Sequence, residues 1–156
     1  AVALLEEYRL TFEVMGTPLS KGSHRAFIGW NKAGKPYAYI TDDNPKTKRW
    51  QKEVAKVAFQ AREHQAPIIE PVVAAYRFYL PRPKSAPKRV AVPAKKPDLG
   101  KLVRVIEDAM TQAGIYNDDA QIVDSFEIKR FAGGPDDPLG IAGKPRVEVI
   151  VKRWRL

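Results

Sequence analysis

The sequence predicts an α/β (α+β) fold in which a mixed β-sheet carries two main helices. The chain has 156 residues, the size of one ordinary domain and enough to bury a core without disulfides. Apolar residues make up 44% of it and charged residues 29%, which is the composition of a chain that folds. Its segments alternate between strand-like and helix-like patterns, in the order β, hairpin, α, β, α, β, β. We therefore expect residues 1–156 to form a single domain.

Strand patterns dominate the N-terminal part. Residues Tyr8–Val14 alternate apolar and polar side chains, with β-branched and aromatic types prominent, which predicts a strand. A polar, basic segment that contains Lys21 and Arg25 predicts a loop. Two short apolar segments, Ala26–Trp30 and Tyr37–Thr41, flank a connection that contains glycine, and together they predict a β-hairpin.

The first helix is predicted to begin at Pro45. Asp42, Asp43 and Asn44 are each suitable N-caps, and proline suits the first helical position. The apolar side chains that follow recur at spacings of three and four residues, as on an amphipathic helix: Trp50, Val54, Val57, Ala58 and Ala61. Basic residues, Lys48 among them, occupy much of the remaining surface, which is either solvated or a contact for phosphates.

The second half of the chain predicts one more helix and three strands. Residues Val72–Leu80 are rich in Val, Tyr and Phe and predict a buried strand. The segment 81–97 holds five prolines and six basic residues, which predicts an extended arm that serves as a linker or follows a DNA backbone. Residues Asp98–Ala113 predict the second helix, and Gln121–Lys129 and Arg146–Val151 predict the last two strands.

Charge and the rare residue types narrow the classes of function. Lys and Arg number 27 against 18 Asp and Glu, so the net charge is +9, which favours a polyanionic partner such as nucleic acid. The absence of cysteine excludes disulfides, thiolate metal sites and cysteine nucleophiles, and two histidines are too few for a histidine-built zinc site. No apolar run is long enough to span a bilayer, and no signal-peptide pattern opens the chain. We therefore expect a soluble intracellular protein with no membrane partner.

Three acidic places are candidates for binding a divalent ion: Asp98, Glu107-Asp108 and Asp118-Asp119. Cleavage of a phosphodiester needs an ion that polarises the phosphoryl oxygen and activates a water, and magnesium prefers oxygen ligands. Each place also has a structural explanation. Asp98 suits a helix N-cap, and Asp118-Asp119 suit a turn. Asp108 can pair with Arg104 one turn earlier on the helix surface. The residues alone leave this choice open.

A dense run of motifs covers the predicted second helix and the strand after it. It reads KPDLGKLVR at 96–104, EDAMTQAG at 107–114 and YNDDAQIVD at 116–124. This run resembles the RusA family of Holliday junction resolvases, most closely over residues 95–130. The resemblance implies a RusA-like homodimer in the cytoplasm of a bacterial or phage-infected cell. It also implies a magnesium-dependent endonuclease that resolves four-way DNA junctions by paired nicks in recombination and repair. A two-fold dimer would present two equivalent sites to two equivalent scissile positions.

The same resemblance implies the residues of the site. Asp98 and Asp119 match two of the family's aspartates and would ligate Mg²⁺, with Asp108 or Glu107 completing or orienting the site. Arg104 matches a basic residue, usually lysine in the family, that would hold phosphate or stabilise developing charge. The expected DNA contacts are basic side chains in the loops, the arm and both helices: Lys21, Arg25, Lys48, Lys88, Arg89, Lys95, Lys96 and Lys101.

One departure from the family pattern bears on activity. The family's Asp-x-Asp reads Asp98-Leu99-Gly100 here, so one carboxylate is missing. Glu107 lies two helical turns beyond Gly100 on the same side, about 10 Å along the axis, and Asp108 aligns with a common family acid. The alternative function is therefore a RusA-like protein that binds branched DNA without cutting it.

A third reading is a basic protein that binds single strands or RNA through the aromatic side chains of the hairpin. These are Trp30, Tyr37 and Tyr39. The expectation we prefer is that they pack in the core or across the hairpin.

Overall fold

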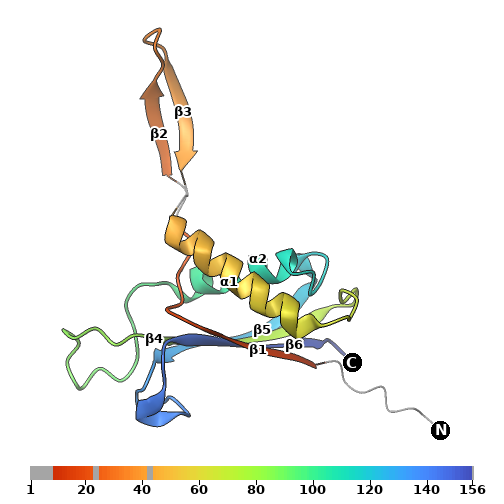
Figure 1. The fold of residues 1–156 in the computed structure, drawn as a ribbon. Helices are drawn as coiled ribbons and strands as arrows, with labels where there is room; N and C mark the ends of the chain where they lie inside the picture. The colour runs from red at the N-terminus through yellow and green to blue at the C-terminus, as the bar shows by residue number, and fades with distance from the viewer. Residues whose placement is uncertain (1–8, 23–24, 42–43, 156) are drawn as a thin grey trace.

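The computed structural model describes residues 9–22, 25–41 and 44–155 (Figure 1). The elements, in chain order, are β1 (Arg9–Met15), β2 (Arg25–Trp30), β3 (Pro36–Thr41), α1 (Pro45–Arg62), β4 (Val72–Leu80), α2 (Leu99–Gln112), the 3₁₀ turn η1 (Asp119–Gln121), β5 (Ile122–Phe131), the 3₁₀ turn η2 (Gly140–Ala142) and β6 (Arg146–Arg153). The predicted fold class and element order are confirmed. Of the cap candidates for α1, Asn44 serves, and its side chain accepts a hydrogen bond from the Lys46 N–H at 3.0 Å, whereas Asp42 and Asp43 lie outside the described residues.

The main sheet has four strands in the order β1-β6-β4-β5. Strand β6 pairs antiparallel with both β1 and β4, whereas β4 and β5 are parallel, so the sheet is mixed. A parallel pair needs a long crossover, and residues 81–97 followed by α2 supply it. This connection lays α2 over the sheet and brings η1, at the start of β5, into contact with the helix.

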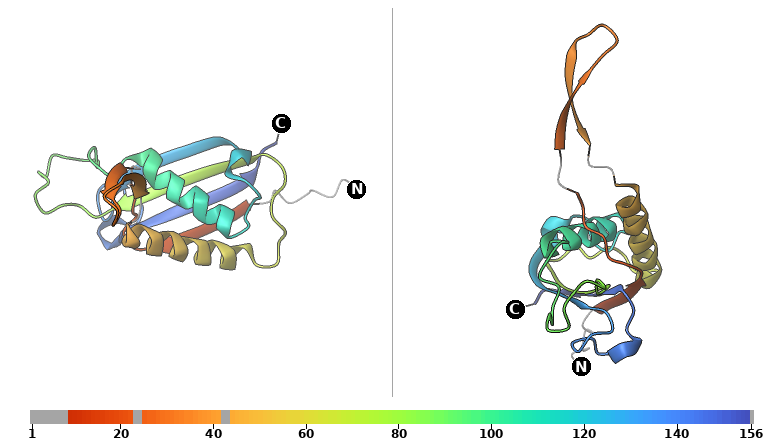
Figure 2. Two further views of the ribbon diagram at one scale, coloured as in Figure 1. Left: turned by 90° about the horizontal axis from the view of Figure 1, so that it is seen from above. Right: turned by 90° about the vertical axis from the view of Figure 1, so that its left-hand side faces the viewer.

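Both helices lie on the same face of this sheet, as the left view of Figure 2 shows. The core between the layers is apolar. Helix α1 contributes Trp50, Val54 and Ala58, and α2 contributes one apolar face that includes Leu102, Val105, Ile106 and Ala109. The sheet contributes the alternate residues of β1, β4 and β6, so burial explains the period-two pattern of these strands. Within the described part of the chain, no helix has the length and apolar character needed to cross a membrane.

A buried ion pair anchors the loop between β5 and β6. Arg146 donates to both carboxylate oxygens of Asp137, at 3.0 and 2.9 Å, and both side chains are almost completely buried. The Asp137 carboxylate also accepts hydrogen bonds from the backbone N–H groups of Gly133 and Leu139. The arginine lies over the Tyr79 ring, with its guanidinium carbon 3.9 Å from the centroid. The Arg146 hydrogen bonds hold the pKa of Asp137 well below its usual range.

Strands β2 and β3 form a separate two-stranded hairpin that stands away from the body (Figures 1 and 2). The expectation that its aromatic residues pack in the core is wrong, because Trp30 is 68% exposed, Tyr37 50% and Tyr39 40%. Packing across the hairpin is confirmed for the two tyrosines, since Tyr39 stacks on Phe27 with ring centroids 5.7 Å apart and Tyr37 lies over Gly29. Arg25 begins β2, and its side chain lies outside the described part of the chain, as does all of His24.

Candidate active site along helix α2

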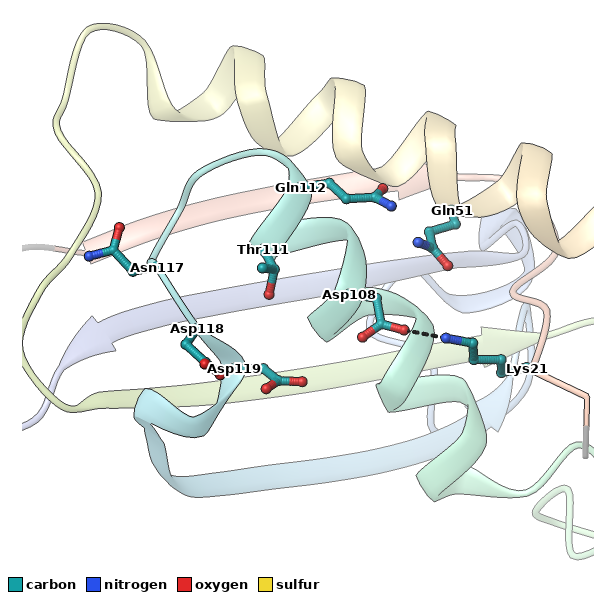
Figure 3. Close-up of a pocket in the computed structure, with 8 residues that line it drawn as sticks. All are labelled: Lys21, Gln51, Asp108, Thr111, Gln112, Asn117, Asp118 and Asp119. Atoms are coloured by element: carbon teal, nitrogen blue, oxygen red, sulfur yellow. Dashed lines mark hydrogen bonds and ion pairs between the residues drawn. The ribbon is translucent and has the colours of Figure 1, made fainter. Parts of the chain in front are cut away.

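A pocket of about 400 Å³ lies beside the C-terminal half of α2 (Figure 3). It gathers side chains from four parts of the chain: Lys21, Gln51, Asp108, Thr111, Gln112, Asn117, Asp118 and Asp119. The lining is polar throughout and contains three carboxylates, so the pocket suits a cation or a hydrated polar group.

A rigid turn presents the two adjacent aspartates. The Asp118 carboxylate accepts the N–H of Ala120 at 2.8 Å, and the Gln121 side chain accepts the N–H groups of Asn117 and Asp118 at 2.9 Å each. The Gln121 amide also donates to the Ile68 carbonyl at 2.8 Å, which ties the turn to the segment before β4. The turn explanation is thus correct for Asp118. Asp119 lies beside it in the same pocket and faces α2.

Like charges crowd this end of the helix. Contact with the Asp118 side chain is the main cause that raises the pKa of Asp119, and burial and the charges of Asp118 and Asp108 add to it. Burial is the main cause that raises the pKa of Glu107, followed by the charges of Asp119, Glu127 and Asp108. Mutual repulsion of carboxylates is what a bound cation would relieve.

A buried tyrosine hydroxyl lies behind the carboxylates. Tyr76 on β4 is fully buried, and its hydroxyl has no hydrogen-bond partner of good geometry among the described residues. Burial raises the pKa of Tyr76. The negative charge of the Glu107 carboxylate raises it further, so the two groups are close enough to interact. Tyr116, by contrast, donates its hydroxyl to the Glu107 carbonyl at 2.9 Å. Tyr76 and Glu127 were not predicted, because no local pattern in a strand indicates which distant acid it will meet.

Lys21 neutralises one of these carboxylates. Its ammonium group donates to Asp108 at 2.6 Å across 87 positions of sequence, and both side chains are partly buried. The predicted pairing of Asp108 with Arg104 on the same helix is therefore replaced by a long-range contact. Arg104 is exposed on α2.

The other end of α2 carries Asp98. This residue occupies the N-cap position, but its carboxylate makes no capping hydrogen bond and instead lies 3.7 Å from the Lys101 ammonium. A second pocket of about 510 Å³ surrounds it, lined by Ser20, Lys21, Gly22, Lys96, Pro97, Asp98 and Lys101. Lys21 lines both pockets, so its charge lies between the two groups of acids.

The predicted metal ligands fall into two groups. Asp98 and Asp108 are ten positions apart on one helix, which separates them by about 15 Å along its axis. Magnesium binds oxygen at about 2.1 Å, so one ion cannot contact both residues of the same chain. Across the described ranges, no three His, Cys, Asp or Glu side chains are arranged to hold a metal ion. The adjacent Asp118 and Asp119 nevertheless fit magnesium, which is commonly held by one or two carboxylates together with phosphate and water.

The remaining predicted DNA contacts lie on accessible surface. Lys88, Arg89, Lys95 and Lys96 are exposed on the arm, and Lys48 is exposed on α1 beside a pocket that it shares with Lys21. The arm has internal order, because Arg82 donates to the carbonyls of Pro87 and Val90. Its end is fixed next to α2, where Lys129 donates to the carbonyls of Lys95 and Pro97 at 2.8 Å each.

Comparison with protein families agrees with this arrangement. The family model described as endodeoxyribonuclease RusA matches residues 17–152, which include the hairpin, both pockets and all predicted site residues. No curated relative matches the chain. Members of the matched family are hydrolases that cut DNA at junctions and generally depend on a divalent metal. This protein therefore belongs to the RusA family of endodeoxyribonucleases.

Proposed function

We propose that the protein resolves four-way DNA junctions by paired, magnesium-dependent nicks, as a homodimer that acts on DNA in the cytoplasm. The observation that carries this proposal is the crowding of carboxylates in a chain of net charge +9. Contact with Asp118 is the main cause that raises the pKa of Asp119, and burial followed by the charges of neighbouring acids raises that of Glu107, although basic residues outnumber acidic ones in the chain. Such repulsion destabilises the fold. A chain would keep these acids together despite that cost if they bind an ion that the function requires.

Asp118 and Asp119 would hold the ion, with Glu107 and Asp108 close by. The ion, when bound, would polarise the phosphoryl oxygen and make a bound water more acidic. Asp108 positions the Lys21 ammonium, which lies between the two pockets and would attract the phosphate of the strand to be cut. The Tyr76 hydroxyl lies behind Glu107 and would donate a hydrogen bond to that carboxylate once it is fully ionised.

The N-terminal end of α2 would hold a second group of site residues, about 15 Å along the helix axis from Asp108. Asp98 remains our predicted ligand there, and Lys101 keeps its carboxylate close to the helix start. Arg104 lies on exposed surface of the same helix and can contact a phosphate with two parallel hydrogen bonds. The arm lysines and Lys48 would follow the DNA backbone, so affinity should fall steeply with salt.

One observation favours a second function, in which the protein holds branched DNA without cutting it. A side chain at Gly100 would meet nothing within 4 Å, so the position where the family pattern has aspartate is open and empty of charge. Loss of that carboxylate leaves Asp98 without an acidic neighbour in the first turn of α2.

The experiment that tests the proposal is nicking of a mobile four-way junction, with and without Mg²⁺, against a linear duplex of the same length. Paired nicks in the junction alone, dependent on Mg²⁺, are expected. Asp119→Asn should abolish nicking, whereas Asp136→Asn, an exposed acid in the loop between β5 and β6, is the matched control and should keep it. Tight junction binding by the wild type with no cut in any divalent metal would establish the second function instead.

A further inference from the structure

The β2–β3 hairpin has two unlike apolar faces. On one face Phe27 and Tyr39 are cross-strand partners, and Tyr37 lies over Gly29, where an added Cβ would come within 2.7 Å of the ring. Phe27 stacks on Tyr39 and Tyr37 packs against Tyr39 in a tilted contact, so this face stabilises the hairpin itself.

The opposite face has no such explanation. Ile28 and Trp30 alternate with the stacked rings along β2 and therefore point to the other side. Ile28 is 72% exposed and Trp30 68%, and the ring contacts of the described residues do not include Trp30. An isolated two-stranded hairpin is marginal in water, and two large apolar side chains exposed together indicate a surface that binds something.

Charge identifies the class of partner. Residues 16–41 contain four Lys or Arg and no Asp or Glu, and Lys32 and Lys35 are exposed near the tip. A second copy of this hairpin would bring like charges together, whereas a polyanion would neutralise them. Exposed aromatic rings among basic residues bind unstacked nucleobases, because every base offers a flat face for stacking.

The position of the hairpin beside the start of α2 fits the same partner. Lys21 precedes it in the chain and Asn44 follows it, and both residues line pockets beside α1 and α2. The hairpin therefore rises from the end of the molecule where α2 begins, beside the pocket that Lys21 shares with Asp98, whereas η1 lies at the other end of α2 (Figure 2). In duplex arms the base faces are already covered by stacking, so a branch point is where a ring can reach them.

We propose that the Ile28–Trp30 face stacks on unstacked bases at the branch point of junction DNA, while Lys32 and Lys35 contact the flanking phosphates. This inference rests on the proposed action on junctions and adds a shape-reading element to it. It assigns recognition of the junction to the hairpin and strand cleavage to the α2 pockets, so the two roles can be tested separately.

The test measures binding without cleavage, in Ca²⁺ or without metal, to a junction that carries 2-aminopurine at the branch point. The wild type should change the probe's fluorescence there, and leave it unchanged when the probe lies in the middle of an arm. Trp30→Ala should lose the branch-point signal and weaken junction binding about 5- to 150-fold, with affinity for linear duplex nearly unchanged. Trp30→Phe should retain most of both, and Trp154→Ala, which removes another partly exposed tryptophan, is the matched control.

The outcomes separate this inference from the proposed function. If Trp30→Ala binds and nicks junctions like the wild type, the inference is wrong and the nuclease function stands. If the wild type shows the branch-point signal but never nicks, the inference stands and the nuclease function fails. If Trp30→Ala instead changes the sedimentation coefficient of the free protein, the face is a contact between copies of this chain, which overturns the proposal.

Discussion

Gly100 occupies the second position of α2, and replacing it with aspartate adds an anion to a helical turn that has none. Glycine destabilises a helix by about 0.5–1 kcal/mol relative to alanine, and aspartate is only a few tenths better, so the backbone part of the gain is small. An anion in the first turn adds about 0.3–1 kcal/mol through the helix dipole at low salt. The added Cβ meets nothing within 4 Å, so no steric cost offsets these terms. The sum is about 1 kcal/mol, which corresponds to a rise in Tm of about 2–4 °C for a chain of this size.

Thermal unfolding at low and high salt checks this value, with Gly100→Asn as the matched control. Asparagine has the size of aspartate without its charge, so it should gain a few tenths of a kcal/mol at either salt concentration, whereas the additional gain from aspartate should shrink as salt rises. Equal stability of the two variants, or a loss in Gly100→Asp, would refute the dipole argument. The same variant should nick junctions faster than the wild type, if the carboxylate that the family pattern places there limits the chemistry.

Three further predictions concern stability and the site. Asp137→Asn should lower the free energy of unfolding by about 3–5 kcal/mol in urea, because it leaves the Arg146 guanidinium buried without a counter-ion. The pKa of Asp137 is lowered in the fold, so its carboxylate stabilises the folded state fully above the ordinary pKa of 3.8, and this stabilisation disappears as the pH falls. Acid titration should therefore destabilise the wild type more than this variant. The pKa of Asp119 is raised instead, so Asp119→Asn should increase Tm slightly at pH 7, with no increase near pH 3, while nicking falls more than about 100-fold. Lys21→Met should cost about 1 kcal/mol of stability by breaking the contact with Asp108, and reduce the salt dependence of junction binding by about one phosphate contact, whereas Lys144→Met should do neither.

Local sequence patterns predicted most of the helices and strands. The stripe through Trp50, Val54 and Ala58 predicted α1 because a helix buries every third or fourth residue, and the alternation in β1 and β6 predicted strands because a strand at the edge of a core buries every second residue. The strand order β1-β6-β4-β5 was not predicted, since pairing between distant segments leaves no trace in either one. The exposure of Trp30 was also missed. An aromatic residue in a strand gives the same sequence pattern whether or not another layer of the protein covers it.

The candidate site was predicted in its residue types more than in its geometry. The motif around Asp119 and the helix start at Asp98 marked the two acidic ends of α2, and both are where the pattern placed them. The contact between Lys21 and Asp108 was not predicted, because it depends on how the segment after β1 crosses the helix. Helix geometry also divides the proposed ligands into two groups, which a comparison of motifs does not reveal.

The strand order has a consequence for how the protein forms. Strand β6 lies between β1 and β4, and Arg9 pairs with Lys152. The N-terminal strand therefore cannot pair in the sheet until the ribosome has added more than a hundred further residues. At about 5–20 residues per second, this wait lasts seconds during synthesis. Until then β1 and β4 have no strand between them, and α1 lacks the sheet face on which its apolar stripe packs. Among the described strands β2 pairs with β3 alone, so the proposed Ile28–Trp30 stacking face can begin to form before the core that supports the acidic pocket is complete.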